Sequence, residues 1–96
     1  MAHKTTSIER DGTKIAFNRP LDITVANCNG RFTVEYVPLG IRIEADRPDT
    51  AIRYFKNELF ACWRKYCTVP ERALNQRGVA KRNHFRQIVS ATTYCG

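Results

Sequence analysis

Apolar and polar residues alternate over three successive stretches in the first half of the chain. In the first stretch, Leu21, Ile23 and Val25 alternate with polar or small residues. A period of two is typical of strands that bury one face. Asn29-Gly30, which follows this stretch, strongly favours a two-residue hairpin turn. We therefore predict an antiparallel meander with one apolar face, made of strands over residues 21–28, 31–37 and 41–45.

Two shorter segments precede the meander and flank the dipeptide Asp11-Gly12. Glycine tolerates the positive φ of a type I′ turn, and aspartate does so better than most residues. The sequence therefore predicts an N-terminal hairpin of residues 5–10 and 13–18. Pro20 has no backbone N–H to donate to a sheet, so we expect the chain to leave the hairpin there.

The apolar spacing changes to three and four residues after the third meander strand. Pro48 suits the first position of a helix, and Asp49 places a negative charge in its first turn. Asp46 has the better capping side chain, whereas Arg47 has the better register for the cap. We predict a helix over residues 48–67 that covers the meander with the apolar residues Ile52, Phe55, Leu59, Cys62, Trp63 and Tyr66.

A second helical pattern follows, with Asn75 as the candidate N-cap. Its narrow stripe consists of Val79, Arg82, Phe85, Ile88 and Val89, and Gly78 near its start is unfavourable in a helix. The last residues, 92–96, are predicted to be loosely ordered. The chain thus reads as a single α+β domain, residues 1–96, in the order β-β-β-β-β-α-α, in which two helices follow the antiparallel sheet.

The positive charge lies mainly in the second half of the chain. The formal net charge is +7, and residues 49–96 hold nine Lys or Arg against three Asp or Glu. A basic half favours contact with phosphate backbones or with an acidic partner, although a solvated charged face is the plainer explanation. If the chain binds nucleic acid, we expect the contacts to come from Arg64, Lys65, Arg77, Lys81, Arg82 and Arg86.

The four cysteines do not form a recognisable metal or disulfide pattern. A zinc site can be drawn from Cys62, Cys67, His84 and Cys95, but the spacings match no standard zinc module. No secretory signal or membrane-spanning apolar run is evident in the sequence. We therefore expect a cytoplasmic protein with reduced cysteines, no metal, no cofactor and no membrane partner.

Catalytic chemistry has little support in the sequence. His84 lies among basic residues, which favour a neutral imidazole, and such a base could act in RNA cleavage. A surface histidine on an amphipathic helix is the interpretation we favour. Glu35 and Glu44 lie on the polar face of the meander, where we expect them to pair with Arg31 and Arg42. The sequence therefore predicts a protein that is not an enzyme.

One resemblance to a known family rests on the run GRFTVEYVPLGIRIEADRPDTAIRYFKNELFACWRKY. The segment FTVEYVPLGIRIEA looks like two strands of the HicB-like antitoxin domain, and RPDTAIRYFKNELFACW looks like its helix, with Ala51 at the family's alanine. The likeness covers about residues 21–90. Thr50 stands where the family has glutamate. The resemblance implies a meander running into a helix, and binding to a small RNase toxin whose active site is masked.

Together these observations predict a non-enzymatic binding domain for protein–protein recognition, either antitoxin-like or a stand-alone HicB-like protein. The partner would be another protein, such as a small RNase toxin, or a second copy in a homodimer. The surfaces expected to matter are the open edge of the meander and the polar side of helix 48–67, because exposed strand edges recruit partners. The alternative is a small basic nucleic-acid-binding protein that uses its C-terminal helix.

Overall fold

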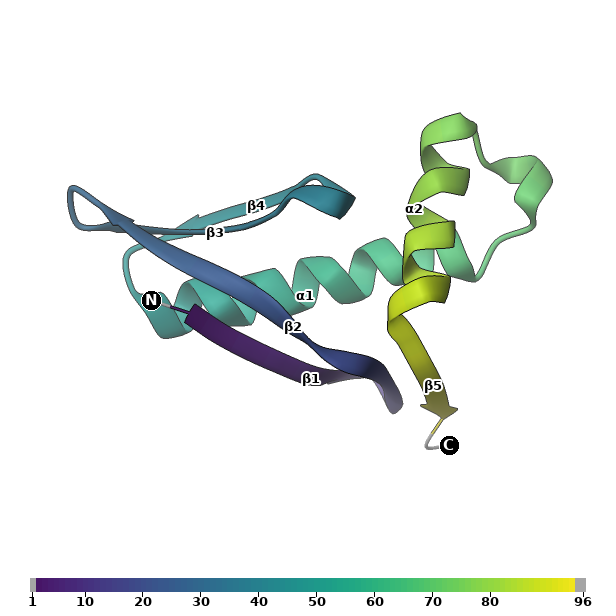
Figure 1. Cartoon of the computed structure of the whole chain (residues 1–96), viewed down its shortest axis with the longest axis horizontal. Coiled ribbons are helices and arrows are strands. Elements are labelled where there is room, and N and C mark those ends of the chain that lie inside the picture. The colour runs from purple at the N-terminus through teal and green to yellow at the C-terminus, as the bar shows by residue number, and fades with distance from the viewer. Residues whose placement is uncertain (1, 95–96) are drawn as a thin grey trace.

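An antiparallel sheet carries one long helix against its apolar face in the computed structural model of the chain, which describes residues 2–94 (Figure 1). The strands are β1 Ala2–Arg10, β2 Thr13–Cys28, β3 Arg31–Tyr36, β4 Ile41–Ala45 and β5 Val89–Tyr94. The helices are α1 Pro48–Cys67 and α2 Gln76–Ile88, with short 3-10 turns at Val37–Leu39 and Glu71–Ala73. The α+β class, the five-stranded antiparallel sheet with its N-terminal hairpin, and the two helices are confirmed for these residues.

Both predicted hairpin turns have the backbone conformation that a type I′ turn requires. The φ angles are +52° at Asp11 and +77° at Gly12, and +52° at Asn29 and +80° at Gly30. Positive φ at both central positions matches the right-handed twist of the flanking strands. These two turns join β1 to β2 and β2 to β3 in the sheet order β1-β2-β3-β4.

β2 is one strand of 16 residues, so the prediction that the chain breaks at Pro20 was wrong. The pairing with β1 explains how a proline is accommodated. Thr5 lies opposite Leu21, but Ser7 lies opposite Ala16, so the intervening part of β2 bulges away from β1. Pro20 falls in this irregular part of the ladder, where no backbone N–H is needed.

The prediction that the tail is loosely ordered was also wrong up to Tyr94, because residues 89–94 form β5. This strand pairs antiparallel with β2, from Thr13 opposite Tyr94 to Phe17 opposite Val89. The pairing of β2 with β3 covers only the second half of β2. The first half of β2 pairs with β5 instead. The fifth strand therefore follows α2 rather than preceding α1. Cys95 and Gly96 lie outside the described residues.

The helix α1 begins and ends at the predicted residues and covers the apolar face of the sheet. Phe55 and Leu59 are fully buried, and the Tyr36 ring of β3 meets Phe55 edge-on at 6.3 Å between ring centroids. Each such side chain contributes roughly 1.5–3 kcal/mol through burial. Arg47 is the N-cap and makes no side-chain capping bond.

Gly78 has a packing reason that the sequence did not reveal. The side chain of Asn75 caps α2, as predicted, by accepting a hydrogen bond from the Gly78 N–H at 2.8 Å. A Cβ at position 78 would lie 3.2 Å from side-chain atoms of both Leu74 and Tyr66. A residue without a side chain therefore lets the start of α2 approach α1 closely. Figure 1 shows α2 standing steeply against the C-terminal part of α1.

Candidate functional site

The outer edge of β4 is the most regular open edge in the described part of the chain. β4 pairs with β3 alone, without interruption from Tyr36 opposite Ile41 to Phe32 opposite Ala45. β1, at the other end of the sheet order, has a register shift after Thr5 that makes its edge irregular. Irregular pairing blunts an edge against strand addition, whereas a regular edge presents aligned backbone donors and acceptors. We therefore take the β4 edge as the candidate site.

The two faces of β4 differ sharply in polarity. Ile41 and Ala45 are buried and Ile43 is half-buried, whereas Arg42 and Glu44 are exposed. A cavity of about 460 Å³ lies along the buried face between β4, α1 and α2. Side chains at this cavity include Ile41, Ile43, Ala61, Cys62, Lys65 and Lys81. The site thus combines an open strand edge with a hollow that has apolar and basic lining.

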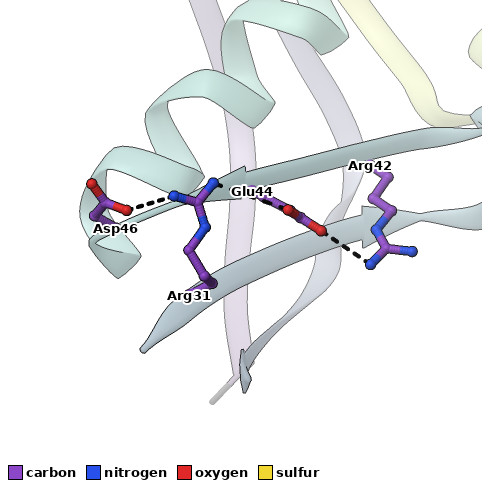
Figure 2. Close-up of polar contacts among 4 residues, drawn as sticks. All are labelled: Arg31, Arg42, Glu44 and Asp46. Atoms are coloured by element: carbon purple, nitrogen blue, oxygen red, sulfur yellow. Dashed lines mark hydrogen bonds and ion pairs between the residues drawn. The ribbon is translucent and has the colours of Figure 1, made fainter. Parts of the chain in front are cut away.

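A row of charged side chains occupies the opposite, exposed face (Figure 2). The Nη1 atom of Arg31 donates to Oδ1 of Asp46 at 2.6 Å, and its Nη2 atom lies 4.0 Å from Oε2 of Glu44. The Nη2 atom of Arg42 donates to Oε1 of Glu44 at 3.2 Å. Exposed pairs of this kind add little stability, about 0–1 kcal/mol each. Their structural effect is to hold the Glu44 carboxylate between two guanidinium groups.

The expected pairing of acids and arginines across the meander is confirmed for Arg31 of β3 and Glu44 of β4, whereas the contact between Arg42 and Glu44 lies within β4. Glu35 lies opposite Arg42 in the strand register. The sequence did not point to Asp46, which was considered only as a helix cap. Asp46 instead accepts a hydrogen bond from Arg31.

Two of the six predicted basic residues come together at the β4 cavity. The Nζ atoms of Lys65 and Lys81 lie 5.4 and 5.1 Å from the centroid of the Tyr66 ring. Cation–π attraction holds both ammonium groups beside the aromatic face. Lys65 comes from α1 and Lys81 from α2, so the packing of the two helices places positive charge at the cavity.

The other four basic residues have different surroundings. Arg82 is only 8% exposed, and its Nη2 atom lies 3.2 Å from Oε2 of Glu71. Arg86 is exposed and lines a second cavity, of about 470 Å³, with Trp63 and Phe85. Arg64 lies 3.9 Å from the Asp11 carboxylate, and Arg77 is exposed in the first turn of α2.

The surroundings of Arg82 therefore indicate a structural role for this side chain. Its Nε atom is buried without a hydrogen-bond partner in the described part of the chain. A buried guanidinium in contact with a carboxylate stabilises a fold only while the partner remains. The sequence placed Arg82 both on the apolar stripe of the helix and among the candidate phosphate ligands, and the structure favours the first placement.

His84 is bound to Tyr36 rather than to another group of catalytic type. The Tyr36 hydroxyl and His84 Nε2 lie 2.7 Å apart, and the two rings are 5.6 Å apart between centroids. Burial raises the pKa of Tyr36 and lowers the pKa of His84. Near neutral pH the bond therefore joins a protonated tyrosine hydroxyl to a neutral imidazole. The sequence predicted this neutral form from neighbouring positive charge, but burial is its main cause.

The cysteines lie in three different environments. Cys28 is exposed, Cys62 is buried and Cys67 is partly buried, and all three are free thiols. Burial raises the pKa of Cys62, and it raises the pKa of Cys67 to about 11. Within residues 2–94, no three His, Cys, Asp or Glu side chains are grouped so that they could hold a metal ion. Cys95 lies outside these residues.

Comparison with known proteins found no matching family model, no similar curated protein and no similar solved structure. In the part of the chain that the structure describes, no helix combines the length and the apolar character that a membrane crossing requires.

The cavity beside β4 is the feature of the site that sequence reasoning missed. Its lining comes from β4, α1 and α2, which are separated in the chain, so no local pattern reports it. The alternation of residues 41–45 did predict that Ile41 and Ile43 face inward and that Arg42 and Glu44 face outward. The prediction of a short meander, which leaves an edge strand open, is the signal that pointed to this edge.

Proposed function

We propose that the chain is a non-enzymatic protein-recognition domain that binds an extended segment of a partner along the outer edge of β4. The observation that carries this proposal is the regular, unpaired edge of β4 beside a cavity of about 460 Å³. Strand addition obtains affinity from backbone hydrogen bonds and specificity from pockets that accept alternate side chains. The β4 edge and its cavity supply both kinds of contact.

The chemistry of the cavity indicates which segment would fit. Side chains on the inner face of an added strand would lie beside Ile41 and Ile43, so apolar residues at alternate positions are favoured. Lys65 and Lys81 would favour a negative charge at one end of the segment, although Glu58 also lines the cavity. An acidic and apolar extended segment is therefore the expected ligand.

The resemblance of residues 21–90 to HicB-like antitoxin domains supports the same class of function. A meander with an open edge that runs into a covering helix suits a domain that masks a surface on another protein. In this proposal the partner is a cytoplasmic protein, such as a small RNase toxin, or a second copy of the chain. The net charge of +7 is unfavourable for a strongly basic toxin, so acidic surfaces on such a toxin are expected to make the contact, whereas a second copy would need local pairs of opposite charge.

Nucleic-acid binding is the second candidate and stays a prediction from the sequence. The exposed or partly exposed residues Lys65, Arg77, Lys81 and Arg86 are the ones that would contact phosphates. We rank it second because Arg82 is buried and paired with Glu71, and Arg64 lies beside Asp11. Phosphate contacts would show as binding that weakens steeply with salt.

The proposed function is tested with peptides selected against the protein. A displayed library of random peptides is selected on the wild-type chain, and the affinities of the selected peptides are then measured by fluorescence polarisation. We expect apolar residues at alternate positions in the selected peptides. Ile43→Lys should weaken binding at least about tenfold, because it places a charge where the added strand turns its apolar side chains.

The matched control is Val37→Lys, which introduces the same charge at a side chain that is 75% exposed and lies outside the strand. This variant should bind the selected peptides as the wild type does. Circular dichroism of both variants checks that the fold is kept. Equal affinity of the wild type and Ile43→Lys, or failure to select any extended peptide, would rule out recognition at this edge.

A further inference from the structure

We propose that the segment received by β4 is the β4 strand of a second copy, paired antiparallel about a two-fold axis through Ile43. This inference rests on the proposed function, since it names the occupant of the same edge. The sequence of β4, Ile41-Arg42-Ile43-Glu44-Ala45, is self-complementary when it is read against its own reverse. The register, the charges and the burial of this strand each support the assignment.

The charges on the exposed face select one register. In antiparallel pairing, residues directly opposite each other point to the same face. When residue 43 pairs with its own copy, Arg42 of each chain lies opposite Glu44 of the other. A shift of two residues in either direction places Arg42 opposite Arg42 or Glu44 opposite Glu44, and like charges directly opposite are destabilising.

The buried face excludes the remaining registers. A shift of one residue would turn the apolar face of one copy to the solvent side of the joint sheet. In the two-fold register, Ile43 meets its own copy, and Ile41 meets Ala45. Ile43 is only half-buried in the single chain, so the second strand would complete its burial. The apolar part of the cavity lies directly beneath this edge.

The charged row of Figure 2 is already arranged for this pairing. The Glu44 carboxylate lies between Arg31 and Arg42 of its own chain, with one oxygen toward each guanidinium. Arg42 of the second copy would approach from the open side and continue the alternation of charges across the axis. Because Glu44 is held in place by its own chain, little side-chain freedom is lost when the copies pair.

The size of the contact sets the expected strength. β4 has five residues, so the paired strands form an interface smaller than those of permanent dimers. We therefore expect a reversible dimer that is seen at high micromolar concentration and above. Pairing would join the two sheets edge to edge and would leave no open β4 edge in either copy.

Sedimentation equilibrium of the wild type and of two charge-reversal variants tests the proposal. Arg42→Glu places two acids opposite each other at both ends of the contact, and Glu44→Arg places two bases there. Each variant alone should dimerise at least about tenfold more weakly than the wild type. An equimolar mixture of the two variants should recover dimerisation, because every pair across the axis is again of opposite charge.

The mixture separates an interface effect from a folding effect. Each variant has the same intrachain repulsion in the mixture as alone, for example the repulsion that Arg42→Glu introduces opposite Glu35. Recovery on mixing therefore reports only the contact between chains. Arg10→Glu is the matched control, since it makes the same change of charge at an exposed residue of β1, at the opposite end of the sheet order from β4. It should dimerise to within about threefold of the wild type.

Several outcomes would overturn the inference. The inference is wrong if the wild type stays monomeric to about 1 mM. It is also wrong if neither charge reversal weakens the dimer, or if the mixture of the two variants does not recover dimerisation. If selected peptides still bind and Ile43→Lys still abolishes that binding, the edge recognises a different protein and the proposed function stands. If Ile43→Lys changes neither peptide binding nor dimerisation, both proposals fail.

Discussion

At the scale of single residues, the contact between Tyr36 and His84 joins the end of β3 to the middle of α2. The sequence separation of the two residues is 48, and their side chains meet at 2.7 Å. The direction of the bond depends on the tautomer of His84, because Nε2 accepts from the Tyr36 hydroxyl when Nδ1 carries the proton and donates to the Tyr36 oxygen when Nε2 carries it. Burial favours the uncharged forms of both groups, because it raises the pKa of Tyr36 and lowers the pKa of His84. The packing of α2 is therefore coupled to pH.

This coupling predicts a loss of stability in mild acid. The pKa of His84 in the folded chain lies below its unfolded value of about 6.5, so the unfolded state binds the proton more readily. The contribution of neutral His84 is present above pH 6.5 and is lost as the pH falls from there through the folded pKa. Urea unfolding at pH 7.5 and 5.0 should show a larger loss of unfolding free energy in the wild type than in His84→Gln. Equal losses would contradict the prediction.

Residue-level features were predictable where their cause is local. The Asn75 cap and the turns at Asp11-Gly12 and Asn29-Gly30 depend on neighbouring residues only, and all were predicted. The ion pair of Arg82 with Glu71 was not predicted, because it depends on how the turn between the helices returns to α2. The open edge was predictable from the number of strands, but the cavity beside it required the packing of three elements.

At the scale of elements, α1 covers the apolar face of the sheet, and adjacent residues in its sequence lie on its buried and exposed faces. Phe55 is fully buried, whereas the adjacent Tyr54 is 47% exposed. The helical period of the apolar residues was strong enough to predict both the bounds and the buried face of α1.

Phe55→Ala should lower the unfolding free energy by about 3–5 kcal/mol, because it removes a fully buried ring and leaves a cavity beneath Tyr36. Tyr54→Ala is the neighbouring control and should cost less than about 1 kcal/mol. Urea titration followed by tryptophan fluorescence measures both values, since Trp63 lies on the same helix. Similar costs for the two variants would show that α1 is rotated from the described orientation.

The strand β5 and the part of β2 around Pro20 were harder to predict from the sequence than α1. β5 follows α2 without a turn, and its six residues have only half-buried or exposed side chains. Periodicity therefore gives it no signal, and its formation depends on the unpaired first half of β2. The same dependence on tertiary partners explains Pro20, which the ladder tolerates only because β2 bulges away from β1 at that position.

At the scale of the whole molecule, β2 is the strand that holds the sheet together, with β1 on one edge and with β3 and β5 sharing the other. Figure 1 shows β5 descending from α2 toward the far end of the β1–β2 hairpin. The hydrogen bond from Asn18 Nδ2 to the Gln87 carbonyl, at 2.6 Å, adds a further tie at the end of α2. The C-terminal segment is thereby part of the sheet.

Ending the chain after Ile88 should destabilise the fold by at least about 2 kcal/mol, since several backbone hydrogen bonds at about 0.5–1.5 kcal/mol each are lost. The exposed edge of β2 should also increase aggregation on heating. Thermal unfolding and light scattering measure the two effects. A chain that ends after Tyr94 keeps β5 and is the control, and it should be more stable than the chain that ends after Ile88. Equal melting temperatures for all three chains would contradict a structural role for β5.

The pairing of Phe17 with Val89 also constrains the order in which the fold is assembled. These residues lie near opposite ends of the chain, so their contact closes a very long loop, and such contacts form late in folding. During synthesis, the first half of β2 leaves the ribosome long before its partner strand exists. Until β5 arrives, a nascent chain carries an unprotected stretch of backbone at residues 13–17, which is the period in which a chaperone would have most to protect.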